Sequence, residues 1–201
     1  MENKKGKLIV FEGPDGSGQS TQAELLKKYL EEKGFQIILT KEPTRESPAS
    51  QKISAILNHK TKATPEELQK LFIEDREHHV EKLILPALVE SRIIICDRYF
   101  FSNFAFGAID CALDWLISLN QNFPIPDLTL ILDVSPEVCL ERITSRGRPV
   151  QFFENLEKLG KVMENYKKVA PMFSNVYLVN GERPIETIHQ EILEIVKKVL
   201  E

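Results

Sequence analysis

The segment KLIVFEGPDGSGQSTQAELLKKYL, residues 7–30, decides the fold class of this chain. Its first six residues, KLIVFE, form a short apolar run of the kind found in strands that are buried on both faces. The glycine-rich stretch GPDGSGQS (13–20) follows, and from Ser20 apolar residues recur at the spacing of one helix face until Gly34 ends the pattern. A strand, a glycine-rich turn and a helix in this order are typical of a phosphate-binding loop.

The glycine-rich stretch predicts a site for phosphate. Glycines let the backbone curl so that successive N–H groups point at one anion, and the helix adds the positive end of its dipole. The spacing matches G-x-x-x-x-G-K-[ST] except that Gln19 stands in the lysine position. A charge about 4 Å from a phosphate contributes roughly 4 kcal/mol at an effective dielectric constant of about 20, so its loss corresponds to a rate change on the order of a thousandfold. The alternative is a turn whose glycines serve geometry alone.

Four more apolar runs follow, and helical patterns separate them. We therefore expect an α/β fold with a five-stranded parallel sheet flanked by helices. The expected strands are KLIVFE (7–12), FQIILT (35–40), RIIIC (92–96), LTLILD (128–133) and VYLV (176–179). The expected helices after the first one cover 64–89, 102–120 in two stretches, 135 to about 146, 154–173 and 184–200.

Start signals support two of these helices. Thr64-Pro65-Glu66-Glu67 offers an N-cap threonine, a proline at the first helical position and a glutamate at the third. Ser135-Pro136 repeats the signal of a cap followed by proline. The segment 41–48 is expected to be a loop because prolines interrupt it.

The composition excludes several classes of protein. The chain has 201 residues, with 26 lysines and arginines against 30 aspartates and glutamates, and this net charge of −4 argues against a general nucleic-acid binder. The three cysteines are far apart and form no C-x-x-C pair, which argues against a zinc site or a redox centre. No apolar run is long enough for a signal peptide or a membrane span. We expect one domain over residues 1–201, a cytoplasmic location, and no nucleic-acid or membrane partner.

Charged residues after the third and fourth strands are candidates for phosphate chemistry. Asp97 and Arg98 directly follow the strand 92–96, and the carboxyl ends of strands in an open α/β sheet line the ligand crevice. An isolated Asp-Arg pair would be a capped turn, but beside a phosphate-binding loop a metal-side carboxylate and a phosphate-clamping guanidinium are favoured. Arg142, Arg146 and Arg148 fit either a solvated helix end or a mobile lid that neutralises the transferring phosphoryl group.

Two further groups of side chains are candidate site residues. Phe72 and Arg76 lie four residues apart on one helix face, where an isolated pair would be a core aromatic beside a surface arginine. His78 and His79 are neighbours on the same expected helix and so point different ways, which argues against a shared metal site.

Six landmarks run in order over nearly the whole chain. Together they resemble the thymidylate kinase family, P-loop kinases that phosphorylate dTMP with ATP. The landmarks are FEGPDGSGQSTQ (11–22), LTKEPT (39–44), LFIEDR (71–76), DRYFFSNFAFGA (97–108), PDLTLILDVSPEVCLERI (126–143) and FFENLEKLGKVMENYKKVA (152–170). The resemblance implies a P-loop kinase with a short lid at about 146–153, a homodimer, and Mg²⁺ with ATP as the donor.

The resemblance also implies roles for individual residues. Phe72 would stack on thymine, Arg76 would hydrogen-bond its edge, and Arg98 would hold the acceptor phosphate. Asp15 would contact the dTMP sugar or its metal and waters. The ATP site would comprise Gly13, Asp15, Gly16, Ser17, Gly18, Gln19, Ser20, Thr21 and Arg142. The dTMP site would comprise Asp15, Glu42, Pro43, Phe72, Arg76, Arg98, Asn103 and Phe106. The metal would lie at Ser20 and Asp97, partly through water, and the catalytic set would be Asp15, Asp97, Arg98, Arg146 and Arg148.

The sequence departs from the family pattern at several of these positions. Gln19 replaces the loop lysine, Lys41 stands where arginine usually precedes Glu-Pro, and Phe106 takes a place often held by tyrosine. Two alternatives to a thymidylate kinase therefore stay open. One is a nucleotide-binding paralogue whose catalysis Gln19 has weakened, and the other is a kinase for a different nucleoside monophosphate.

Overall fold

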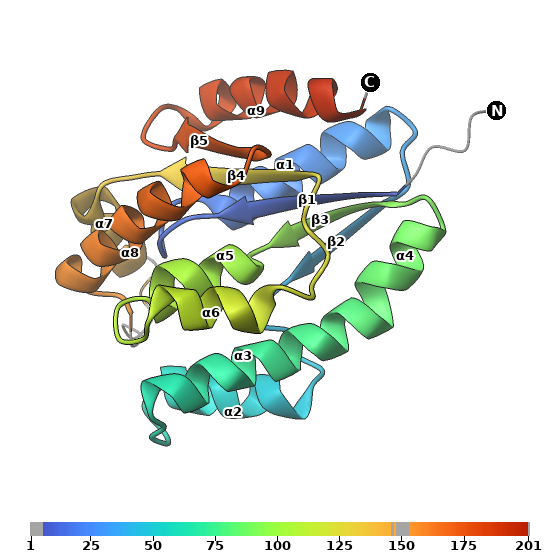
Figure 1. Cartoon of the computed structure of the whole chain (residues 1–201). Coiled ribbons are helices and arrows are strands. Elements are labelled where there is room, and N and C mark those ends of the chain that lie inside the picture. Colours follow the sequence, from blue (N-terminus) through green and yellow to red (C-terminus); the bar gives the residue numbers. More distant parts are fainter. Residues whose placement is uncertain (1–5, 146, 148–152, 201) are drawn as a thin grey trace.

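The computed structural model of the chain describes residues 6–145, 147 and 153–200 (Figure 1). Most of the expected lid, including Arg146 and Arg148, lies outside these residues. No helix in the described part of the chain combines the length and the apolar character that crossing a membrane requires.

Five parallel strands form one sheet, which confirms the predicted fold class. The strands are β1 (Lys7–Glu12), β2 (Ile37–Lys41), β3 (Ile93–Asp97), β4 (Leu128–Asp133) and β5 (Val176–Asn180). Their order in the sheet is β2-β3-β1-β4-β5, so the first strand of the chain lies at the centre. The register pairs Asp97 with Phe11 on one side and with Lys41 on the other. The carboxyl ends of β1, β2 and β3 therefore meet at one edge of the sheet.

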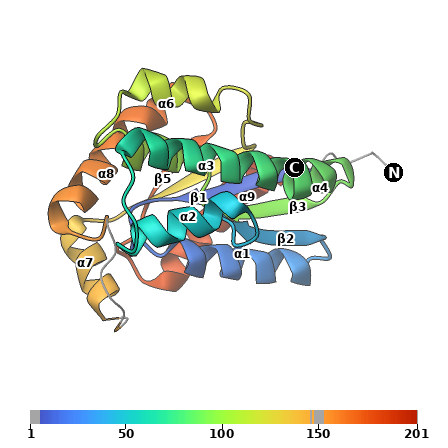
Figure 2. The ribbon, with the colours of Figure 1, turned by 90° about the horizontal axis from the view of Figure 1, so that it is seen from below.

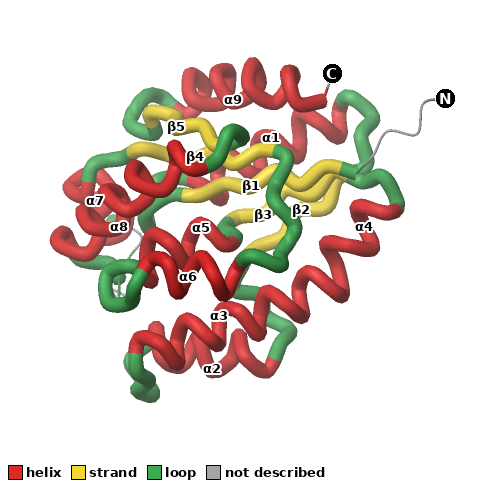
Figure 3. The backbone as a smooth tube through the Cα atoms, in the orientation of Figure 1, coloured by secondary structure: helices red, strands yellow, loops and turns green. Residues whose placement is uncertain are grey.

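Helices cover both faces of the sheet (Figures 1 and 3). The α-helices are α1 (Gln19–Glu32), α2 (Pro48–Leu57), α3 (Pro65–His79), α4 (Leu85–Val89), α5 (Phe100–Ser102), α6 (Leu113–Asn120), α7 (Pro136–Thr144), α8 (Leu156–Val169) and α9 (Ile185–Leu200). Helices α1 and α9 cover one face, and α2, α3, α5 and α6 lie on the other. Seen from below in Figure 2, α3 and α2 run side by side across the sheet.

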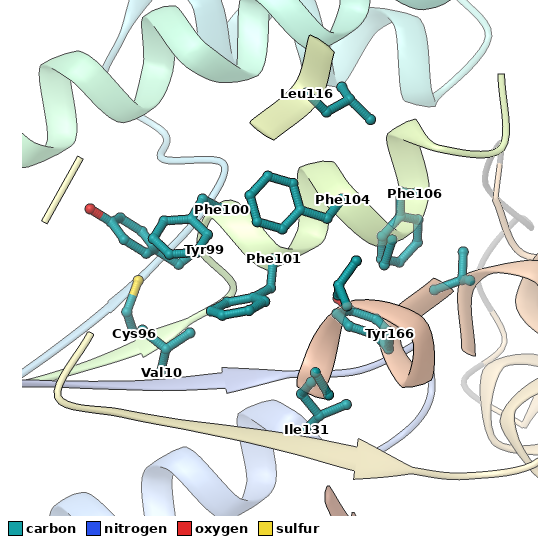
Figure 4. Close-up of a cluster of buried hydrophobic side chains, with 14 of the residues drawn as sticks. Val10, Cys96, Tyr99, Phe100, Phe101, Phe104, Phe106, Leu116, Ile131 and Tyr166 are labelled. Atoms are coloured by element: carbon teal, nitrogen blue, oxygen red, sulfur yellow. The ribbon is translucent and has the colours of Figure 1, made fainter. Parts of the chain in front are cut away.

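Alternate side chains along the strands point into two separate buried cores, one on each face of the sheet. Ile9 and Phe11 of β1 pack with α1 and α9, while Leu8 and Val10 face the opposite core. That second core is rich in aromatic side chains, several of which come from the segment that follows β3 (Figure 4). The inner strands β1, β3 and β4 are buried, as their continuous apolar runs predict, whereas the edge strands β2 and β5 are partly exposed.

Both helices with start signals begin where the sequence predicts, but only one forms its side-chain cap. At Thr64 the full capping box forms, with Glu67 donating its backbone N–H to Thr64 Oγ1 and accepting from the Thr64 N–H, and the helix continues through a π-helical turn to Val89. At Ser135 the helix begins as expected, but the serine side chain makes no capping bond, and the carboxylate of Glu182 accepts the Ser135 N–H.

One helix was missed and two strands are shifted. Proline ends the expected loop at Pro48, but it occupies the first turn of α2, where Ser47 caps the helix by accepting from Ser50 N–H. A proline at this position starts a helix rather than breaking one. Strand β2 runs from Ile37 to Lys41 and β3 from Ile93 to Asp97, so each ends one residue later than the apolar runs indicate.

Candidate active site

The phosphate-binding loop lies between β1 and α1, where the sequence places it. Gly13, Gly16 and Gly18 have φ values of 147°, 87° and 103°. At Gly16 a Cβ atom would come within 2.5 Å of the Cys139 carbonyl oxygen, so the close approach of α7 also requires glycine. Gly18 is the N-cap of α1 and has no side chain, so the first N–H groups of the helix are left for an anion.

Gln19 occupies the lysine position with its side chain turned back onto the loop. Its Nε2 donates to the carbonyl oxygen of Gly13 at 2.8 Å, and the residue is only 6% exposed. The neutral amide therefore joins the two ends of the loop but brings no positive charge to a phosphate.

Asp97 lies at the carboxyl end of β3, beside the start of α1. Ser20 Oγ donates to its Oδ2 at 2.5 Å, and Lys41 Nζ contacts the same oxygen at 2.7 Å. The other carboxylate oxygen, Oδ1, is buried and has no hydrogen-bond partner among the described residues. Mg²⁺ prefers hard oxygen ligands and keeps waters and substrate phosphates in its shell. The Ser20 hydroxyl and this unused carboxylate oxygen therefore fit the ion predicted for them.

Arg98 links the phosphate-binding loop to the part of the cleft lined by Phe106. Its backbone has a positive φ of 76°, and its guanidinium donates to Gly13 O at 2.9 Å and to Asp15 Oδ1 at 2.8 Å. Burial opposes the charge, but Asp15 together with the more distant Tyr166, Asp97 and Glu12 outweighs it, so the pKa of Arg98 is raised above its ordinary value. The guanidinium carbon also lies 4.9 Å from the centre of the Phe106 ring. Arg98 is thus a fixed, permanently charged group, as a phosphate clamp requires.

Glu12, the last residue of β1, holds the segment that carries Arg98. Its buried carboxylate accepts from Tyr99 N at 2.8 Å, Ser102 N at 3.2 Å, Ser102 Oγ at 2.7 Å and Tyr166 Oη at 2.7 Å. Burial raises the pKa of Glu12 to about 7, although Arg98 and the hydrogen bonds oppose this rise. One side chain thereby ties the phosphate-binding loop, the turn after β3 and α8 together.

Arg76 is buried, which rules out the surface arginine considered for this position. It is 2% exposed, and its Nε donates to Glu42 Oε2 at 2.8 Å while Nη2 lies 2.6 Å from the same oxygen. Nη1 donates to Asn103 Oδ1 at 2.5 Å and to Asn120 Oδ1 at 2.6 Å. Asn103 Nδ2 in turn donates to Gln69 Oε1 at 2.8 Å, which turns its carbonyl oxygen toward Arg76. The guanidinium is therefore held in one orientation.

Most of the predicted residues line one cleft of about 390 Å³. It extends from the phosphate-binding loop to Phe72 and Arg76 on α3. The predicted residues that line it are Asp15, Gly16, Gly18, Gln19, Ser20, Thr21, Glu42, Pro43, Phe72, Arg76, Arg98, Asn103 and Phe106. Gly13 and Asp97 lie behind this lining and reach it through the hydrogen bonds of Arg98 and Ser20.

Arg142 lies on the other side of the loop. It donates to Ser17 O at 3.3 Å and to Gly181 O at 3.1 Å, and therefore is not a freely solvated helix end. It joins the phosphate-binding loop to the turn after β5. The lid roles of Arg146 and Arg148 stay predictions, because both residues lie outside the described part.

Several residues that support the site have little or no signal in the sequence. Glu12 could have been noticed as an acid that ends a buried apolar strand beside the glycine-rich loop. Gln69, Asn120 and Tyr166 carry no comparable signal, because only the packing of α3, α6 and α8 brings them to Arg76 and Glu12.

Comparisons with known proteins agree with this geometry. The sequence model of the family described as thymidylate kinase matches residues 11–192. A protein of Pyrococcus horikoshii named "Probable thymidylate kinase" is 43% identical over 98% of this chain and 98% of its own length. One of Desulfotalea psychrophila, named "Thymidylate kinase", is 39% identical over 100% of this chain and 98% of its own length. With both the family pattern and full-length relatives matched, this chain belongs to the thymidylate kinase family.

Proposed function

We propose that this chain transfers the γ-phosphoryl group of ATP to the 5′-phosphate of dTMP, giving dTDP and ADP for dTTP synthesis. One observation carries the proposal: a single cleft joins a phosphate-binding loop to Arg98 and to a pocket built around Phe72 and Arg76. A protein that only bound a nucleotide would have less use for the second half of this cleft.

On the donor side, the loop backbone and the first N–H groups of α1 bind the phosphates of ATP. Ser20 and Asp97 would hold Mg²⁺, partly through water, and the ion would neutralise charge on the phosphates. The amide of Gln19 keeps the loop closed through Gly13. Positioning and electrostatics then account for the catalysis, since phosphoryl transfer needs no covalent intermediate with the protein.

On the acceptor side, Arg98 binds the 5′-phosphate of dTMP and Phe72 stacks on the base. Nε and Nη1 of Arg76 are used by protein acceptors, and Nη2 contacts Glu42 with one of its two N–H groups, so its second N–H is the one that can donate to a base oxygen. Thymine offers an acceptor at O4, whereas cytosine offers an amino group there. A fixed donor at this place favours thymine over cytosine.

The other predictions complete this proposal. Arg146 and Arg148 would approach the phosphoryl group from the lid, and Arg142 would lie near the bound ATP. We also infer a homodimer and a cytoplasmic location for the enzyme, within one domain that spans residues 1–201.

The direct test is ADP formation from Mg²⁺ and ATP, with dTMP, dUMP, dCMP or dGMP as acceptor and a sample without acceptor as the control. We expect turnover that depends on an acceptor and is fastest with dTMP. Faster turnover with another monophosphate would indicate a different nucleotide kinase. Binding of dTMP without any turnover would favour the nucleotide-binding paralogue.

A pair of arginine variants tests the acceptor clamp. Arg98→Met should lower kcat/KM for dTMP about a hundredfold or more, as loss of one charged donor at a transition state does. Arg92→Met is the matched control, because Arg92 precedes the same strand at the opposite edge of the sheet and pairs with Glu90. Equal losses in both variants would contradict the assignment of Arg98.

A further inference from the structure

The phosphate-binding loop has no positive side chain at the lysine position. Gln19 is neutral, and its amide is engaged with Gly13 O inside the loop. The acidic residue of the loop, Asp15, is paired with Arg98. A cation at the donor phosphates must therefore come from another part of the chain.

Lys41 is placed to supply that cation. It is the last residue of β2 and pairs in register with Asp97 of β3. Its Nζ lies 2.7 Å from Asp97 Oδ2, the same oxygen that accepts from Ser20 Oγ. One carboxylate oxygen thus brings the ammonium group to Ser20 at the start of α1, the residue that follows Gln19 in the sequence.

The environment of Lys41 differs from that of Arg76 and Arg98, although Arg45, which also lines the cleft, is exposed as well. Its side chain is 54% exposed and lines the cleft, whereas the side chains of Arg76 and Arg98 are 2% and 12% exposed and are held by carboxylates. An ammonium group has three donors, and a flexible stem of four carbons carries it. Lys41 can therefore keep Asp97 as one partner and still offer donors to a phosphate.

We propose that Lys41 supplies, from β2, the positive charge that the phosphate-binding loop lacks at Gln19, and that its ammonium group contacts the phosphates of ATP. This inference rests on the proposed phosphoryl transfer. The competing explanation is that Lys41 only neutralises Asp97. The two explanations differ in one consequence: a lysine placed at position 19 can replace a phosphate cation, but it cannot replace an ion pair at Asp97.

Four proteins form the test: the wild type, Gln19→Lys, Lys41→Met and the double variant. We expect Lys41→Met to lower kcat about a hundredfold or more, the scale set by losing a charge near a phosphate. Gln19→Lys should then raise kcat at least about tenfold more in the Lys41→Met background than in the wild type. Lys28→Met, an exposed lysine on the outer side of α1, is the matched control and should leave kcat unchanged.

Binding gives a second readout that does not depend on turnover. Calorimetric titration should show weaker ATP binding in Lys41→Met, recovery in the double variant, and unchanged dTMP binding in both. Thermal unfolding of each variant identifies proteins that fail to fold, and Lys41→Gln then takes the place of a misfolded Lys41→Met.

Two results would overturn the role of Lys41. One is a kcat and an ATP affinity of Lys41→Met within about threefold of the wild type. The other is an effect of Gln19→Lys of equal size in both backgrounds, since independent sites contribute additively. If the wild type binds dTMP but does not phosphorylate it, the proposed function fails, and the ATP titrations still decide the role of Lys41.

Discussion

Replacing Glu12 by glutamine should change how the stability of the protein depends on pH. The exchange conserves shape, and it leaves Oε1 to accept from the backbone N–H groups of Tyr99 and Ser102. The new amide group takes the place of Oε2, where the hydroxyls of Ser102 and Tyr166 can accept a hydrogen bond instead of donating one. The main difference is therefore the charge of a buried carboxylate.

The magnitude follows from the raised pKa of Glu12. Burial raises it from 4.5 to about 7, so the folded state binds the proton more tightly than the unfolded state does. Ionisation of Glu12 then costs stability as pH rises from about 4.5 to about 7, and at about 1.4 kcal/mol per pKa unit the full cost is about 3 kcal/mol. The free energy of unfolding of Glu12→Gln, minus that of the wild type, should rise by about this amount between pH 4.5 and pH 8.

Urea denaturation at pH 4.5, 5.5, 6.5, 7.5 and 8 measures this difference directly. Other titrating groups are common to both proteins, so they cancel in the comparison. Glu24→Gln, at an exposed position of α1, is the matched control for replacing a carboxylate by an amide. If the curves of Glu12→Gln and the wild type stay parallel over this range, the reasoning about burial of Glu12 is refuted.

Three further predictions concern the cleft and its supports. Phe72→Ala should raise KM for dTMP about tenfold or more and leave KM for ATP unchanged, because base stacking is worth about 1–3 kcal/mol; an equal rise in both constants would contradict its place in the base pocket. Gly16→Ala should weaken ATP binding in calorimetry, since the new Cβ would meet Cys139 O at 2.5 Å, whereas Gly34→Ala, with a similar φ of 85° and open space around it, should bind ATP like the wild type. Thr64→Ala removes the capping box of α3 and should lower the free energy of unfolding by about 1 kcal/mol; an unchanged urea midpoint would count against that contribution.

Local sequence patterns predicted the fold class and most of the elements. Continuous apolar runs identified all five strands, because the inner strands of a parallel sheet are buried on both faces and the edge strands β2 and β5 carry similar runs. Start signals worked where the cap could form locally, as at Thr64. At Ser135 the helix also begins as predicted, but the contact that the Ser135 N–H makes with Glu182 comes from a distant segment and has no local signal. The loop expected over 41–48 leads directly into α2, because Pro48 lies in the first turn of that helix, a position that favours proline.

The candidate site also contains residues whose positions local sequence predicts and residues whose positions it does not. The loop at 13–20 was readable because its function depends on backbone shape, which glycine spacing encodes locally. The positions of Asp97 and Arg98 followed from a rule about strand ends that needs only the order of elements.

By itself, the sequence determined a parallel α/β sheet, a phosphate-binding loop and the membership of the chain in a kinase family. Only the tertiary structure decided that Arg76 is buried against Glu42, that Glu12 holds the turn after β3, and that Lys41 meets the oxygen bound by Ser20. The physical reason is that strand and loop patterns depend on neighbours in sequence, whereas charge, burial and hydrogen-bond partners depend on residues that only the packing of separate elements brings together.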